Sequence, residues 1–186
     1  MLKRALAIQE KRYEPDHSQV AIILTNLGIV YGDLGNHEEK KELLERALAI
    51  QEKHYGPDHF QVAITLTNLS NAHGDLGNLQ KAKELLERAL AIQEKHYEPN
   101  HFTVAIILKN LGGTYGDLGD SQKAKELFER ALPIFEKHYG PDHLEVAKLL
   151  ANLSITYGDL GNPQKAKELL EQASFILEKH HVHDYF

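Results

Sequence analysis

A period of 42 residues runs through the chain, and this repetition constrains the fold more than any other feature of the sequence. The dipeptide Asp-His or Asn-His begins at residues 16, 58, 100 and 142, and the tetrapeptide Gly-Asp-Leu-Gly begins at residues 32, 74, 116 and 158. A fixed period of about 20–50 residues is typical of stacked repeats, which bury their apolar surface against one another. We therefore expect a single repeat domain over residues 1–186, with repeats at about 16–57, 58–99, 100–141 and 142–183.

Each repeat is expected to contain two antiparallel helices, A and B, joined by short turns. In the first repeat Val20, Leu24, Leu27, Tyr31 and Leu34 recur at steps of three and four, which predicts an apolar stripe along helix A. Strong helix formers dominate the second half of each repeat, as in KAKELLERALAIQEKHY. The fold class is thus all-α, with A helices expected near residues 17–33, 59–75, 101–117 and 143–159.

Polar residues mark the expected helix starts, because a side-chain oxygen can accept a bond from an orphan backbone N–H. The expected caps of the A helices are Asp16, Asp58, Asn100 and Asp142, and those of the B helices are Asn36, Asn78, Asp120 and Asn162. Glu39 is placed to complete a capping box with Asn36. Residues 2–13 fit a helix B with no helix A before it, which brings the expected number of helices to nine.

The composition narrows the classes of function. The chain has a formal net charge of -6 at pH 7 and no cysteine, which fits a reducing compartment and excludes disulfides and thiolate metal sites. An acidic balance disfavours nucleic acid, and no apolar run approaches the roughly 18 residues that suggest a membrane-spanning helix. We expect a cytoplasmic protein that binds neither nucleic acid nor membrane.

The spacing Leu-x-x-Leu-Gly-x-x-Tyr, followed by Ala-x-x-x-Leu-x-x-Ala, resembles the tetratricopeptide repeat. In the second repeat Ser70 and His73 replace the usual glycine and tyrosine, whereas Gly28 and Tyr31 match them in the first repeat. The linker Tyr-Gly-Pro-Asp-His-x-x-Val-Ala, at residues 55–63 and 139–147, is similar to that of the 42-residue repeats of kinesin light chains. The resemblance implies a right-handed superhelical solenoid whose concave groove, lined by the A helices, holds a peptide or a partner protein.

The face of helix A opposite its apolar stripe is the expected groove. Isoleucines on several successive helices make a patch of the kind that usually marks binding, although they could instead pack against the next repeat. The asparagine of each Asn-Leu pair could bind a peptide backbone or tie adjacent repeats together, and we favour the second role. The candidate groove residues are Ile22, Thr25, Asn26, Ile29, Ile64, Thr67, Asn68, Asn71, Ile106, Lys109, Asn110, Lys148, Ala151, Asn152 and Ile155.

Two departures from known peptide-binding patterns concern this face. Kinesin light chains commonly read Leu-Asn-Asn-Leu, and this chain lacks the first asparagine in all four repeats, which argues against their cargo-peptide specificity. Domains that bind chaperone tails grip a terminal carboxylate with a cluster of Lys, Arg and Asn. Here only Asn71, Lys109 and Lys148 are available for that role, so the clamp is expected to be incomplete.

No catalytic, cofactor or metal site is expected. The Gly-Asp-Leu-Gly turn ends a helix, whereas a phosphate-binding loop begins one. The twelve histidines mostly recur with the repeat near helix ends. The cluster His180, His181 and His183 has no spacing that would fix three ligands on one helical face.

The two ends of the array are expected to leave apolar surface uncovered. Leu2 and Leu6 lie on a helix without a preceding helix A, and Phe175, Ile176 and Leu177 lie on the last helix B. Three hypotheses follow: a groove-type scaffold for a peptide or partner protein, a self-associating array that forms a homodimer or an end-to-end oligomer, and a cargo adaptor of the kinesin-light-chain kind. We favour the first.

Overall fold

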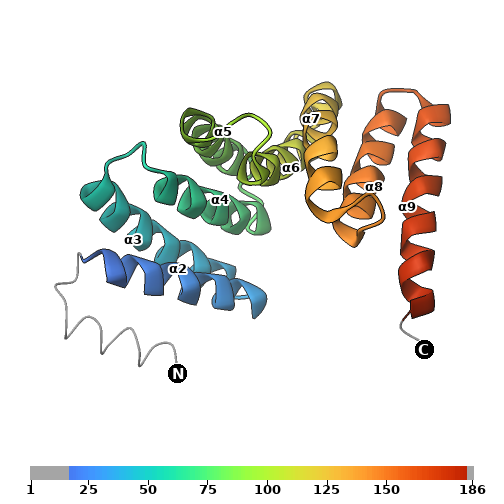
Figure 1. The fold of residues 1–186 in the computed structure, drawn as a ribbon. Coiled ribbons are helices and arrows are strands. Elements are labelled where there is room, and N and C mark those ends of the chain that lie inside the picture. Colours follow the sequence, from blue (N-terminus) through green and yellow to red (C-terminus); the bar gives the residue numbers. More distant parts are fainter. Residues whose placement is uncertain (1–16, 184–186) are drawn as a thin grey trace. The chain divides into compact units, whose positions relative to one another are not determined.

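The computed structural model describes residues 17–183, and Figure 1 shows them as a succession of helices. These residues form eight α-helices and no strand, which confirms the all-α fold class. The expected helix at residues 2–13 lies outside the described residues. The helices are α2 (Ser18–Asp33), α3 (His37–Tyr55), α4 (Phe60–Asp75), α5 (Leu79–His96), α6 (Phe102–Asp117), α7 (Ser121–Tyr139), α8 (Leu144–Asp159) and α9 (Pro163–His183).

The A helices of the sequence are α2, α4, α6 and α8, and each is 16 residues long. Each begins one residue after its expected start and ends at its expected last residue. The B helices are α3, α5, α7 and α9, and each packs against the A helix before it. The expected helix pairs are therefore confirmed in the described part of the chain. None of its helices is long and apolar enough to cross a lipid bilayer.

A histidine caps each A helix, so the prediction of aspartate or asparagine caps was wrong by one residue. The Nδ1 atom of His59 accepts a hydrogen bond from the backbone N–H of Gln61, at 3.2 Å. The longer imidazole side chain reaches from the residue next to the helix, and this leaves the preceding Asp58 free to pair with Lys95. The same contact recurs at His17, His101 and His143, with distances of 3.1–3.3 Å.

The B helices use two of the predicted caps. Asp120 and Asn162 accept hydrogen bonds from backbone N–H groups three residues later, at 3.0 and 3.1 Å. Asn36 makes no side-chain cap bond, so the expected capping box with Glu39 is not formed.

A left-handed glycine ends each A helix. Gly35 has a φ of 77°, a region that side chains with a Cβ rarely adopt, and its N–H donates to the carbonyl of Gly32 at 2.9 Å. The next residue, Asn36, donates its N–H to the carbonyl of Tyr31, also at 2.9 Å. These bonds satisfy the last carbonyls of the helix and turn the chain into helix B.

Small residues in the A helices let the B helices approach closely. A Cβ added to Gly112 would lie 2.7 Å from the ring of Phe128, and one added to Gly28 would lie 3.1 Å from Leu44 Cγ. At the equivalent place in α8, Ser154 is buried and donates its hydroxyl to the carbonyl of Ala166, at 2.7 Å. The motif glycine is therefore a packing requirement that serine can also meet.

The described helices form two compact units, one ending at His96 and the other beginning at Tyr97. Unit 1 contains α2 to α5, and unit 2 contains α6 to α9. The expectation of one continuous repeat domain stays a prediction. In unit 1 the stripe residues Val20, Leu24 and Leu27 are buried as expected, whereas Leu34 caps the end of α2 and is 69 % exposed.

Candidate partner-binding face of the A helices

Isoleucines form the exposed apolar part of this face in unit 1. Ile22 and Ile29 of α2 are 42 % and 40 % exposed, and Ile64 of α4 is 40 % exposed. Val30 of α2, which the sequence analysis did not single out, is 38 % exposed. Since α2 and α4 are in contact, these side chains belong to neighbouring helices of one compact unit.

The two threonines on this face are half-buried and have their hydroxyl protons engaged. Thr25 donates to the carbonyl of Ala21 at 2.9 Å, and Thr67 donates to the carbonyl of Ala63 at 2.8 Å. A partner can therefore meet these side chains through their methyl groups and through the remaining lone pairs of their oxygens.

The recurring asparagines differ in exposure along the chain. Asn26 and Asn152 are exposed, whereas Asn68 and Asn110 are half-buried. Asn71, one helical turn further along α4, is exposed. Their proposed roles, either binding a peptide backbone or tying repeats together, stay predictions.

The two lysines on this face share one carboxylate. Glu145 Oε1 lies 2.7 Å from Lys148 Nζ, and Glu145 Oε2 lies 3.4 Å from Lys109 Nζ. The hydrogen bond from Lys148 and the charges of both lysines lower the pKa of Glu145, and the pKa of Lys148 is raised in turn. Lys109 also lies 5.5 Å from the centre of the Phe135 ring. The cluster therefore carries one net positive charge, with Lys109 held in place.

A cavity of about 350 Å³ opens on this face in unit 2. Two of the candidate residues, Asn152 and Ile155 of α8, line it, and Ile155 is 66 % exposed. The opposite wall belongs to α6, and the Phe128 ring of α7 forms part of the lining. Neither this cavity nor its acidic residues, Asp117 and Asp159, was predicted from the sequence. The remaining candidates in unit 2, Ile106 and Ala151, are half-buried.

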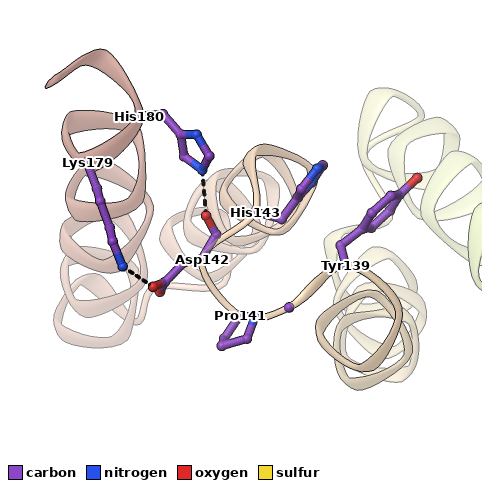
Figure 2. A pocket seen from close by; sticks show the side chains of 7 residues that line it. Tyr139, Pro141, Asp142, His143, Lys179 and His180 are labelled. Atoms are coloured by element: carbon purple, nitrogen blue, oxygen red, sulfur yellow. Dashed lines mark hydrogen bonds and ion pairs between the residues drawn. The ribbon is translucent and has the colours of Figure 1, made fainter. Parts of the chain in front are cut away.

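A second cavity in unit 2, of about 340 Å³, lies beside the linker that joins α7 to α8 (Figure 2). Asp142 lines this cavity and makes two contacts with α9. Its carboxylate pairs with Lys179, and its backbone carbonyl lies 2.8 Å from His180 Nε2. The rings of Tyr139 and His143 stack across the linker, with their centres 4.4 Å apart. These polar groups are satisfied by one another, so we assign them to holding the linker rather than to binding.

The last helix, α9, exposes apolar side chains on the surface predicted for self-association. Phe175 is 64 % exposed and Leu177 is 41 % exposed, and Leu170, which was not predicted, is 53 % exposed. Ile176 is only 5 % exposed, so its assignment to this surface was wrong. It continues the core positions of Ile50, Ile92 and Ile134, which recur at the 42-residue period and are all buried. Leu2 and Leu6 lie outside the described residues.

Among the side chains that the structure describes, no group of three or more His, Asp or Glu residues is arranged to hold a metal ion. His73 is the histidine of this part of the chain whose pKa is clearly shifted. Burial lowers it, with smaller and opposing effects from Glu45 and Lys41. The tail cluster considered in the sequence falls largely outside the described side chains.

Comparison with known families and structures agrees with this geometry. A sequence model of the tetratricopeptide repeat family matches residues 1–53, 33–95, 71–137 and 103–179. Among curated protein sequences, none matches the chain significantly.

Several solved structures share the fold. A kinesin-light-chain-type protein of Podosopora anserina with nearly identical TPR-like repeats is 31 % identical, with a TM-score of 0.77 over 96 % of this chain and 85 % of that chain. A point variant of that protein gives a TM-score of 0.79 over 97 % of this chain and 85 % of that chain. BtubC (BKLC) from P. vanneervenii is 26 % identical, with a TM-score of 0.83 over 97 % of this chain and 72 % of that chain. MamA, at 21 % identity and a TM-score of 0.69, supports the fold alone.

Proposed function

Because the chain belongs to the tetratricopeptide repeat family, we propose that it binds a peptide or a partner protein along the exposed face of its A helices. Proteins of this fold typically act as interaction scaffolds rather than as enzymes, and the proposal assigns no catalytic residue. The right-handed superhelix, the concave groove and the cytoplasmic location expected from the sequence are retained as part of it.

The observation that carries the proposal is the exposure of isoleucines on the A helices. Ile22, Ile29 and Ile64 each leave 40–42 % of their surface open on neighbouring helices of unit 1, and Ile155 leaves 66 % open in unit 2. Burying one such side chain fully is worth about 1.5–3 kcal/mol, so several partial burials can offset the entropic cost of holding a short peptide. Exposed asparagines beside them supply donors and acceptors for a peptide backbone.

A random peptide library displayed on phage tests the proposal directly. Peptides selected on the full chain are expected to lose about tenfold or more in affinity when Ile22 and Ile64 are both changed to serine, a loss of at least about 1.4 kcal/mol. The Asn71→Ala and Lys109→Ala double variant is expected to weaken binding as well. Leu118→Ser is the matched control, because Leu118 is 40 % exposed like Ile64 but lies at the end of α6.

Two results count against the proposal. One is that the isoleucine variants and the Leu118 control bind the selected peptides equally well. The other is that the selected peptides contact B helices alone. Circular dichroism of each variant shows whether a loss of binding reflects a loss of fold.

The exposed face of α9 favours self-association as a second candidate function. Leu170 and Leu177 are 53 % and 41 % exposed, whereas Phe128 and Phe135, one repeat earlier, are 3 % and 1 % exposed. The earlier positions are covered because α8 packs on α7, and no described helix follows α9. A second copy of the chain could cover this face with its own first helices, where Leu2 and Leu6 are the predicted contacts.

Sedimentation over a concentration series separates this candidate from the first. A dimer or longer oligomer that dissociates when Leu170 and Leu177 are made serine supports self-association. A monomer at ~100 μM, a concentration at which contacts worth roughly 5–6 kcal/mol would already be half formed, argues against it. The cargo-adaptor hypothesis rests on the similarity to kinesin-light-chain-type repeats and stays a prediction.

A further inference from the structure

The space lined by α6, α7 and α8 is an open cavity in unit 2, whereas a lysine side chain of the protein fills the equivalent space in unit 1. This difference points to a ligand. An offset of 84 residues relates α2, α3 and α4 of unit 1 to α6, α7 and α8 of unit 2. Every residue around the unit 2 cavity therefore has a counterpart in unit 1. Six counterparts differ: Ile29, His37, Lys40, Leu44, Asn71 and Ala72 in unit 1 correspond to Gly113, Ser121, Ala124, Phe128, Ile155 and Thr156 in unit 2.

In unit 1 the side chain of Lys40 occupies this place. A Cβ added to Gly32 would lie 2.7 Å from Lys40 Cδ, so the lysine stem crosses α2 where the backbone is bare. The ammonium lies 3.0 Å from Asp75 Oδ2, and the Lys40 side chain is only 12 % exposed. His37 Nδ1 also lies 3.0 Å from Asp75 Oδ2. In unit 1 the stem of Lys40 therefore covers Gly32, and its ammonium group pairs with the carboxylate of Asp75.

In unit 2 the glycine and the two aspartates of this place remain, as Gly116, Asp117 and Asp159, and alanine replaces the lysine. The nearest side-chain atom to a Cβ placed on Gly116, the counterpart of Gly32, is Ala124 Cβ at 3.9 Å. Asp159, the counterpart of Asp75, accepts one hydrogen bond, from the Ser121 hydroxyl at 3.2 Å. Asp117 lines the same cavity, and neither carboxylate pairs with any lysine, arginine or histidine whose side chain the structure describes. The cavity therefore has two carboxylates without a counter-ion.

We propose that this cavity of unit 2 binds a lysine side chain of the partner, in the way that unit 1 holds its own Lys40. The inference rests on the proposed function and deepens it by naming the residue type recognised. The ammonium pairs with Asp159, with Asp117 adding to the negative field. The methylene stem lies over Gly116 and against the Phe128 ring, and Asn152 at the rim meets the peptide backbone.

Charge and size both select this ligand. Asp117 and Asp159 are both exposed, so a carboxylate side chain would be repelled by their charges, whereas an apolar side chain would gain nothing from them. The volume of about 350 Å³ is at the small end of the range for ligand cavities, which suits one side chain rather than a larger group. Long aliphatic stems of lysine commonly cover apolar surface while the charged end reaches a polar site.

A titration with short peptides tests the proposal without knowledge of the natural partner. The probes are three blocked tripeptides, acetyl-Gly-X-Gly-amide, in which X is lysine, norleucine or arginine. Backbone amide signals of the full chain are followed by NMR. The lysine peptide is expected to shift Gly113, Gly116, Asn152 and Ile155 with millimolar affinity, about tenfold tighter than norleucine, which has a similar stem without the ammonium.

Variants locate the site within the molecule. Asp159→Asn is expected to reduce lysine binding about tenfold, whereas Asp33→Asn, at the counterpart of Asp117 in unit 1, is the control and leaves it unchanged. Ala124→Lys rebuilds the internal lysine of unit 1 and is expected to abolish binding of the peptide. Ala124→Met fills the same space without adding a charge. It therefore shows whether Ala124→Lys acts by filling the cavity or by neutralising the carboxylate of Asp159. Lys40→Ala is expected to open a second lysine site in unit 1.

Three results overturn the lysine proposal: equal binding of lysine and norleucine, no binding at about 20 mM, or tighter binding of arginine than of lysine. Binding that survives both Asp159→Asn and Ala124→Lys, with the fold intact by circular dichroism, does so too. Library peptides that need Ile22 and Ile64 but ignore Ala124→Lys would refute the lysine site and leave the proposed function standing. The opposite result is that Asp159→Asn abolishes binding of the lysine tripeptide, while changing Ile22 and Ile64 to serine leaves the binding of library peptides unchanged. That result would refute the proposed groove and leave the lysine site standing.

Discussion

Lys95 Nζ lies 2.7 Å from Asp58 Oδ2, and this ion pair joins the end of α5 to the linker that precedes α4. The next residue, His96, brings its Nε2 to 2.7 Å from the Asp58 backbone carbonyl. The hydrogen bond from Lys95, followed by its charge, lowers the pKa of Asp58. A linker with no regular structure of its own is thus held by the helix that packs beside it.

The same joint recurs in unit 2 but not in every repeat. Lys179 and His180 hold Asp142 in the same way (Figure 2). Between them, Asn100 occupies the aspartate position, and His138 stacks on Phe102 with ring centres 3.7 Å apart. An amide carries no charge to attract Lys137, so this joint is built from aromatic contacts instead.

Asn100→Asp is expected to restore the ion pair with Lys137 and to raise the unfolding temperature slightly. The gain should shrink at high salt, because both side chains are exposed and their attraction is screened. Thermal unfolding at low and high ionic strength checks this. The control is Gln172→Glu, which adds the same charge at an exposed position inside α9, and an equal, salt-independent change in both variants would contradict the prediction.

Pro133→Ala is expected to stabilise the chain by about 1–3 kcal/mol. Pro133 is an exposed residue inside α7, where its missing N–H cannot donate to the carbonyl of Glu129. The equivalent residues of α3 and α5 are Ala49 and Ala91, so alanine suits this position. The reverse change, Ala91→Pro, should destabilise by about 3 kcal/mol in urea unfolding. A neutral Pro133→Ala would show that α7 has adapted to its proline.

Gln51→Leu is expected to raise the free energy of unfolding by about 1 kcal/mol. Gln51 is 3 % exposed and its Oε1 has no hydrogen-bond partner, whereas Phe135 occupies the equivalent position of α7. An apolar side chain removes the cost of burying that oxygen. Urea denaturation measures the change, and Gln80→Leu, at an exposed position of α5, should stay within about 0.5 kcal/mol of the wild type. A loss of stability in Gln51→Leu would mean that the amide makes a contact worth more than its burial costs.

His73→Tyr is expected to reduce the loss of stability in mild acid. Burial lowers the pKa of His73 below its ordinary value of 6.5, so the unfolded chain binds the proton more readily than the folded chain. The folded state therefore keeps its full stability above pH 6.5, the ordinary pKa of histidine, and loses stability as the pH falls from there to the pKa of His73 in the folded chain. Tyrosine, which stands at the equivalent positions 31, 115 and 157, takes up no proton there. Urea unfolding at about pH 7.5 and about pH 5 should show a smaller difference in the variant, and an unchanged difference would contradict this.

The fold could be predicted almost completely, because period and turn chemistry determine it. Helix A ends where a glycine with positive φ is required, so its last residue followed directly from the sequence. Its first residue was wrong by one, because His59 and Asp58 are both polar and only the geometry shows which one reaches the N–H of Gln61. The same ambiguity applies at every A helix.

The candidate site could be predicted only where one helix determines it. The exposure of Ile22 and Ile64 follows from their place opposite the buried stripe. The cavity of unit 2 exists because two small residues on different helices, Gly113 of α6 and Ala124 of α7, leave space between the helices. Neither residue predicts a cavity by itself. The error at Ile176 was avoidable, since Ile50 and Ile134 lie at the same phase of the repeat and are buried in the core.

A mapped complex tests the central claim, that partners bind the A-helix face, more directly than any variant does. The measurement is the NMR shift perturbation of the full chain by a peptide selected from the random library. The largest shifts are expected on α2, α4, α6 and α8, centred on Ile22, Ile29, Ile64 and Ile155. Shifts confined to the B helices, or to Leu170 and Leu177 of α9, would contradict it.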